Sequence, residues 1–250
     1  MKTFQYHLKA IKTIFALFSK GKFLIYFIPG LLLTLFFFYV NSLLAKLGKS
    51  DITTTPDQSP TVVVSALEYI NHQFYTFFIL IVLSPVNSIL SKKLDTHLTD
   101  YVHTSSFSET LNNILRMIFI LSITLFFEFV IMGVWWLFAL VTSLDVLNPF
   151  VYVLVAAFFY GFSFYDYNLD RYHRSTKGSL KYGTHHILSM LIAGGLFMVL
   201  KFVPFVGFII APVLVTMLTT IIYLYSIKKL PKKSNRRHSI NLQTVEKTDE

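Results

Sequence analysis

The feature that most constrains this chain is an uncharged run of 23 residues from Phe23 to Ala45, FLIYFIPGLLLTLFFFYVNSLLA. An α-helix rises about 1.5 Å per residue and the hydrocarbon core of a bilayer is about 30 Å thick, so about 20 apolar residues span it. Five lysines and no acidic residue precede the run. Because a lysine-rich flank tends to stay in the cytoplasm, we predict a first membrane helix with a cytoplasmic N-terminus.

The composition agrees with a chain that lies mostly in lipid. Hydrophobic residues make up 54% of the sequence and charged residues 14%, against about 25% charged residues in soluble domains. The net charge of +9 does not point to nucleic acid, because 11 of the 22 basic residues lie in segments 1–22 and 228–237, next to apolar runs. We interpret them as topology determinants and contacts to lipid headgroups. The absence of cysteine excludes disulfides, thiolate metal sites and cysteine nucleophiles.

Six apolar segments follow one another along the chain. They are residues 23–45, about 69–90, 117–144, 146–165, 185–200 and 202–227. Basic residues favour the N-terminus, residues 166–186 and the chain after 228, which predicts that both termini lie in the cytoplasm. We therefore expect an all-α, polytopic protein of the cytoplasmic membrane. Residues 1–228 form its membrane domain, and residues 229–250 form a basic, disordered tail.

The last two segments are spaced for a hairpin that enters the membrane only partway. Residues 185–200 span about 24 Å as a helix, which is marginal for crossing. The turn that follows contains Pro204, which removes a backbone donor, and Gly207, which tolerates a sharp corner, and Pro212 lies beyond it. The alternative is two ordinary spanning helices joined by a short outside turn, and spacing alone does not choose between them.

Two isolated charges lie within apolar sequence. Glu128 has 11 uncharged residues before it and 16 after it. A carboxylate at that depth must face a partner or water, or be protonated, so it is a candidate for an ion or proton pathway; otherwise it lies near an interface or is neutral within a helix contact. Lys201 is expected to extend to the outer headgroups, and the alternative is that it attracts anions at a pore mouth.

The most site-like stretch is Ser84–Leu94, SPVNSILSKKL. The Ser-Pro dipeptide predicts the end of one helix, after which Asn87 or Ser88 can cap a new one. A helix N-terminus offers free N–H groups and positive potential, which suit an anion, and Lys92 and Lys93 lie about one turn further on. The competing interpretation, which the residues alone favour, is a kink followed by a capped cytoplasmic helix.

Asp166 and Asp170 close the fourth segment and, four residues apart, share one helix face. We expect them to pair with Lys or Arg of another loop, since two carboxylates make a poor metal site. No catalytic motif, phosphate-binding loop or dinucleotide loop is present, so no enzymatic activity, cofactor or metal is expected.

Four motifs in chain order resemble the CysZ/etoposide-induced-protein-like membrane family, whose bacterial CysZ members are sulfate permeases. They are the basic segment leading to Ile28-Pro29, the stretch from Ser84 to Leu90, the segment from Tyr165 to Asp170, and the hairpin sequence from Val203 to Val213. The likeness covers residues 8–228. The chain departs from the family pattern in several places: the paired arginines before the first helix have no clear match, and Glu128 lies where the family has a Pro-Gly corner. Ser88 stands where the sulfate permeases have Gly, and Lys92 stands where they have an acid.

The resemblance implies long spanning helices, shorter helical hairpins that enter the membrane partway, homo-oligomers and an anion path lined by helix ends. The anion-binding candidates that it carries over are Asn87, Ser88, Ile89 and Leu90, through their backbone N–H groups. We therefore expect a membrane protein that moves a small inorganic anion, sulfate by default, with the lipid bilayer as its other partner. The alternative is a non-transporting organiser of membrane proteins from the same family.

Overall fold

The computed structural model describes residues 2–47, 62–99, 107–172, 175–203, 206–227 and 230. Helices are the only regular elements among these residues, which confirms the predicted all-α class. In chain order they are α1 Lys2–Phe18, η1 Leu24–Phe27, α2 Ile28–Leu47, α3 Val62–Thr99, α4 Phe107–Thr142, η2 Asp145–Leu147, α5 Asn148–Arg171, α6 Thr176–His185, α7 Ile187–Lys201 and α8 Gly207–Ser226.

The chain is a multi-pass membrane protein by the length and composition of its helices. Within the described residues, four helical stretches are long and apolar enough to cross a bilayer: Thr76–Thr99, Leu115–Thr142, Asn148–Arg171 and Gly207–Ser226. The run that predicted the first span corresponds to η1 and α2. The helix α2 begins only at Ile28, because Gly21 and Phe23 adopt left-handed backbone angles that turn the chain after α1.

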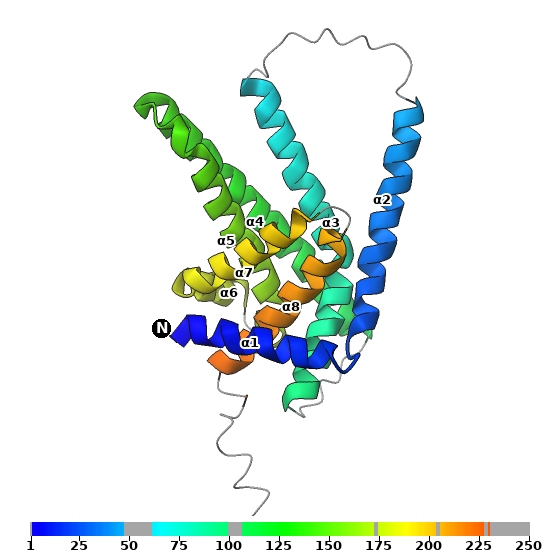
Figure 1. The fold of residues 1–250 in the computed structure, drawn as a ribbon. Coiled ribbons are helices and arrows are strands. Elements are labelled where there is room, and N and C mark those ends of the chain that lie inside the picture. Colours follow the sequence, from blue (N-terminus) through cyan, green and yellow to red (C-terminus); the bar gives the residue numbers. More distant parts are fainter. Residues whose placement is uncertain are drawn as a thin grey trace, which may run out of the picture.

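The long helices α3, α4 and α5 run together, α7 crosses them near mid-height, and α8 descends from there toward α1 (Figure 1). The helix α5 is central, because every residue from Ala156 to Leu169 except Phe158 is buried. Its neighbours are α3, α4, α7 and α8. Such a helix has no lipid-facing side over this length, so its polar residues must be satisfied within the protein.

Glycines allow α5 and α7 to touch backbone to backbone. A Cβ atom at Gly194 would lie 1.7 Å from the carbonyl oxygen of Ala157, and one at Gly161 would lie 2.0 Å from that of Met190. Side chains smaller than a methyl group are therefore required at both positions. This small-residue packing is typical of membrane helices, where close van der Waals contact replaces the hydrophobic effect between helices.

The α7–α8 hairpin reaches only partway along the bundle. Lys201, the last residue of α7, lies 5.1 Å from the ring centre of Tyr160, which is midway between the two ends of α5. The tip also ends well below the upper ends of α2 and α5 (Figure 1). This geometry favours the partly penetrating hairpin over two ordinary spans. Gly207 forms its corner, since a Cβ there would lie 2.5 Å from the Leu200 carbonyl oxygen. Pro204 is outside the described residues.

The N-terminal helix α1 lies crosswise to α2 at the lower end of the bundle (Figure 1). Its inner face packs on α8, where the rings of Tyr6 and Tyr225 stack at 5.6 Å. A second apolar stripe points outward. It consists of Phe4, Leu8, Ile11 and Phe15. A helix with an exposed apolar stripe and flanking lysines fits the bilayer interface. The sequence identified this segment only as a basic flank.

The helix break expected at Pro85 is wrong, because α3 continues through that residue from Val62 to Thr99. The short helix α6 was not predicted, and it meets α7 at a 90° bend. Pro212 lies inside α8 and interrupts neither its length nor its burial. The predicted tail at 229–250 lies outside the described residues except for residue 230.

The α5–α7 contact predicts opposite outcomes for two adjacent glycines. Gly194→Ala places a methyl group against backbone and should destabilise the fold by about 1–3 kcal/mol, the usual cost of overpacking. Gly195 has no atom within 4 Å of its would-be Cβ. Gly195→Ala should therefore leave stability unchanged or raise it by up to about 1 kcal/mol. Unfolding of the purified variants in detergent measures both, and equal stability of the two variants would contradict the packing described.

Buried His7 predicts that acid weakens the docking of α1. Burial lowers the pKa of His7 below its ordinary 6.5, although the hydrogen bond of its Nδ1 to the Thr3 carbonyl opposes this. The undocked helix therefore binds a proton more readily, so docking is complete above pH 6.5 and is lost as pH falls toward the lowered pKa. Hydrogen exchange of residues 2–18, corrected for intrinsic rates, should show less protection at pH 5.5 than at pH 7.5.

The matched variants for that experiment are His7→Leu, which should remove the difference between the two pH values, and His185→Leu, which alters an exposed histidine and should keep it. Equal protection of the parent at both pH values would contradict the account.

Candidate functional site

Four side chains from four helices meet at the end of α7, and we refer to them as the tip cluster. They are Thr76 of α3, Glu128 of α4, Tyr160 of α5 and Lys201 of α7. The Lys201 Nζ donates a hydrogen bond to the Thr76 hydroxyl at 3.2 Å and lies over the Tyr160 ring. Glu128 is near enough to Lys201 to act on it electrostatically. The two isolated charges in the sequence, 73 residues apart, are therefore neighbours.

Burial makes the tip cluster unusual. Glu128 is 0% exposed and Lys201 is 8% exposed. The interpretation that Lys201 extends to the outer headgroups is wrong, because its ammonium group is held inside the bundle by Thr76 and Tyr160. Of the interpretations open for Glu128, an interface position does not fit a fully buried side chain. A carboxylate and an ammonium group that share a buried site offset part of each other's desolvation cost.

A second polar group joins α4, α5 and α6. The Arg116 guanidinium lies 3.3 Å from the Asp166 carboxylate and 2.8 Å from that of Asp170, and it donates to the Ser179 hydroxyl. This is the pairing that the sequence favours over a cation site for the two aspartates. The arginine connects the C-terminal part of α5 to α4 and α6, so its role here is structural.

A third group lies where α3, α5 and α8 meet. Arg171 forms an ion pair with Asp95 at 2.9 Å, and both side chains are buried. Asp95 also accepts a hydrogen bond from the Tyr172 hydroxyl at 2.9 Å. Ser91 lies at the centre and contacts Arg171, Asn168 and Thr220. Loss of one partner from such a buried pair costs about 3–5 kcal/mol, so this group also holds the helices together.

The stretch predicted to bind an anion does not form the predicted helix start. Since α3 is continuous there, the N–H groups of Asn87, Ser88, Ile89 and Leu90 fall in a helix interior, where backbone carbonyls occupy them. The side chains also diverge. Those of Asn87 and Leu90 are buried, Ile89 and Lys93 are exposed, and Ser88 and Lys92 are intermediate. Anion binding by these residues stays a prediction.

Thr76, Tyr160, Asp95 and Arg171 were not singled out from the sequence. Asp95, Arg116 and Arg171 look like ordinary loop charges there, and Thr76 and Tyr160 lie within apolar runs. The available signals were the isolated charges Glu128 and Lys201, whose cost in lipid demands a partner without indicating which one. Among the described residues, no cluster of three or more His, Asp or Glu side chains is placed to hold a metal ion.

One family of known proteins matches most of the chain. A family model described as sulfate transporter CysZ/etoposide-induced protein 2.4 matches residues 10–212, from α1 into α8. No individually curated protein matches the chain. Because the matched region covers most of the sequence, the chain belongs to the sulfate transporter CysZ/etoposide-induced protein 2.4 family.

Proposed function

We propose that this protein moves a small inorganic anion, sulfate by default, across the cytoplasmic membrane, and that Lys201 of the tip cluster is the charge that binds it. Membership of a transporter-type family supports a transporter-like rather than an enzymatic role. The single observation that carries the anion proposal is a lysine ammonium group buried at a hairpin tip that meets the middle of α5.

The surroundings of Lys201 suit an anion. The Thr76 hydroxyl accepts a hydrogen bond from the ammonium group and so fixes its position, and the Tyr160 ring face stabilises the cation when no anion is present. In a medium of low dielectric constant, an anion gains far more from one such charge than it does in water. The hairpin tip therefore supplies a favourable anion-binding position inside the protein.

A change in the charge of Glu128 would allow the bound anion to be released. While Glu128 is ionised, it and Lys201 neutralise each other, so an additional anion is not attracted. When Glu128 takes a proton, the net charge of the cluster becomes positive and an anion is favoured beside Lys201. In this scheme the anion and the proton bind together and leave together, which is an ion-coupled form of transport.

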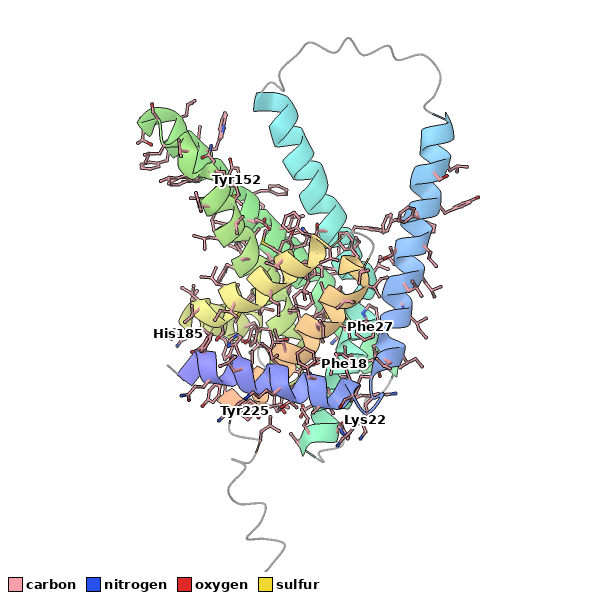
Figure 2. All side chains as sticks on the ribbon, in the orientation of Figure 1. Phe18, Lys22, Phe27, Tyr152, His185 and Tyr225 are labelled. Atoms are coloured by element: carbon pink, nitrogen blue, oxygen red, sulfur yellow. The ribbon has the colours of Figure 1, made fainter. Side chains whose placement is uncertain are left out.

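The charge distribution supports the proposed orientation. The ends of α3 and α8 lie beside α1, as shown by the Lys22–His97 contact of 3.2 Å and the Tyr6–Tyr225 stack (Figure 2). This end, which we call the α1 end, carries most of the described lysines. They include Lys9, Lys12, Lys20, Lys22, Lys92, Lys93, Lys177 and Lys181. At the other end, Asp145 is the one charged residue in the sequence of the η2 turn. Under the positive-inside rule, the α1 end faces the cytoplasm. Assembly into homo-oligomers remains a prediction.

A non-transporting organiser of membrane proteins is the second candidate. It is favoured by the departures from the permease pattern at Ser88 and Lys92 and by the basic tail. Deletion of residues 229–250 should then change binding partners or localisation. A deletion with neither effect would count against a role that depends on the tail.

Radiolabelled sulfate uptake into proteoliposomes tests the transport proposal. The parent should show saturable uptake above empty vesicles, and Lys201→Met should reduce it at least about tenfold, because truncation of a buried, hydrogen-bonded charge costs about 2–5 kcal/mol. Glu128→Gln, which cannot ionise, should still bind sulfate but lose the part of the uptake that depends on a proton gradient. No uptake by folded, inserted parent protein would refute the proposal and favour the organiser.

Three controls make the result specific. The double variant Lys201→Met/Glu128→Gln leaves no buried charge in the tip cluster, so it should fold and still fail to transport. Lys20→Met removes an exposed lysine between α1 and η1 and should transport like the parent. Lys92→Glu/Lys93→Glu tests the stretch predicted from the sequence. If that variant alone abolished uptake, the binding charge would lie on α3 rather than at the hairpin tip.

A further inference from the structure

A second basic site lies at the opposite end of α7 from the tip cluster. An open cavity of about 340 Å³ is present where α6 turns into α7 and α8 ends. Its lining residues are Lys181, Tyr182, His185, His186, Ser226 and Ile227. His185 marks the place at the side of the bundle, near the α1 end (Figure 2). A volume of this size falls in the range of small-molecule pockets, about 300–1,000 Å³, so it admits a group larger than one inorganic ion.

The described residues of the lining are basic, aromatic or neutral, and none of them is acidic. Lys177, Lys181 and His185 are spaced four residues apart and share one face of α6. Asp166 and Asp170 are the acidic residues of α5 that lie nearest to α6 along the chain. Both form ion pairs with Arg116. Two further lysines, Lys228 and Lys229, directly follow the lining residue Ile227 in the sequence. This local excess of positive charge fits a negatively charged ligand.

Both histidines are oriented by the backbone. The Nδ1 of His185 lies 2.7 Å from the Lys181 carbonyl oxygen, and the Nδ1 of His186 lies 3.0 Å from that of Tyr182. Because a carbonyl oxygen only accepts, each Nδ1 carries a proton and donates it, which leaves Nε2 as the ring atom available to a ligand. The His186 ring is held further by stacking on Tyr182 at 4.0 Å.

The backbone at this corner also favours an anion. The carbonyl oxygens of the last turn of α6, which would repel one, accept hydrogen bonds. That of Lys181 accepts from Thr184 and His185, and those of Tyr182 and Gly183 accept from the His186 N–H. The helix α7 begins directly after His186, and the first N–H groups of a helix carry positive potential.

We propose that this cavity binds a phosphate group, with the Lys181 ammonium group as its charged donor and His185 and His186 as the other side chains that contact it. The phosphate has two possible sources, the headgroup of an anionic phospholipid and free inorganic phosphate. The cavity lies at the α1 end, beside a helix whose exposed apolar stripe fits the bilayer interface, so either source has access to it. This site is separate from the tip cluster and does not depend on transport through it.

Binding to the purified full-length protein in detergent tests the proposal with two probes, dioctanoyl phosphatidic acid and inorganic phosphate. Titration calorimetry gives the affinity for each. The pocket variant is Lys181→Gln/His185→Gln/His186→Gln, and all three side chains are exposed, so the fold should survive. It should weaken binding of at least one probe about tenfold, which equals about 1.4 kcal/mol. The matched control, Lys9→Gln/Lys12→Gln/Lys20→Gln, removes three exposed lysines elsewhere at the α1 end, which we interpret as general contacts to lipid headgroups. It should bind inorganic phosphate like the parent and weaken the binding of phosphatidic acid less than the pocket variant does.

The two probes separate the two sources. Loss confined to phosphatidic acid assigns the cavity to a lipid headgroup, loss confined to inorganic phosphate assigns it to a free anion, and loss of both assigns it to the phosphate group itself. Each of these results supports the proposal. It is overturned if neither probe binds the parent, or if the pocket variant and the control bind both probes equally.

Discussion

The close approach of α5 and α7 is the contact on which the rest of the structure depends. Gly194 and Gly161 remove the side chains that would keep the two backbones apart. Since α7 can then lie directly against α5, its last residue, Lys201, reaches Tyr160 in the middle of the bundle. The same contact returns α8 along α5, where the Thr219 hydroxyl donates to the Phe164 carbonyl. Without it, neither the partial hairpin nor the tip cluster would form.

A helix surrounded on all sides by other helices cannot send its charges to water, and α5 shows how the chain resolves this. Asp166 and Asp170 meet Arg116 from α4, and Arg171 meets Asp95 from α3. These pairs connect α5 to its neighbours at the α1 end. The tip cluster differs in kind, because its lysine comes from a hairpin end and its carboxylate from another helix. The Arg116 group and the Arg171 group therefore stabilise the fold. The tip cluster is the group that is suited to a change in its charge.

The helical class, the apolar segments and the hairpin with Gly207 at its corner were predictable, because long uncharged runs and Gly/Pro punctuation are local properties. The helices α1 and α6 were not predicted, since both are polar enough to look like flanks or loops. The prediction of a helix break at Pro85 was wrong, because packing on both sides keeps α3 helical although proline lacks a backbone N–H donor. Of the site, Glu128 and Lys201 were identified singly. Their proximity was not, because it arises only when α7 crosses the bundle.

The depth of the hairpin tip in the bilayer tests the central claim most directly. The chain has no cysteine, so a nitroxide attached to a single introduced cysteine reports one position only. Phe202 at the tip and Val146 in the η2 turn are both well exposed, at 72% and 83%. Oxygen and nickel-chelate accessibility of labels at Phe202→Cys and Val146→Cys should place the tip deep in the hydrocarbon and the turn at the surface. A tip label as shallow as the η2 label would show that α7 and α8 are two ordinary spans and would contradict the account.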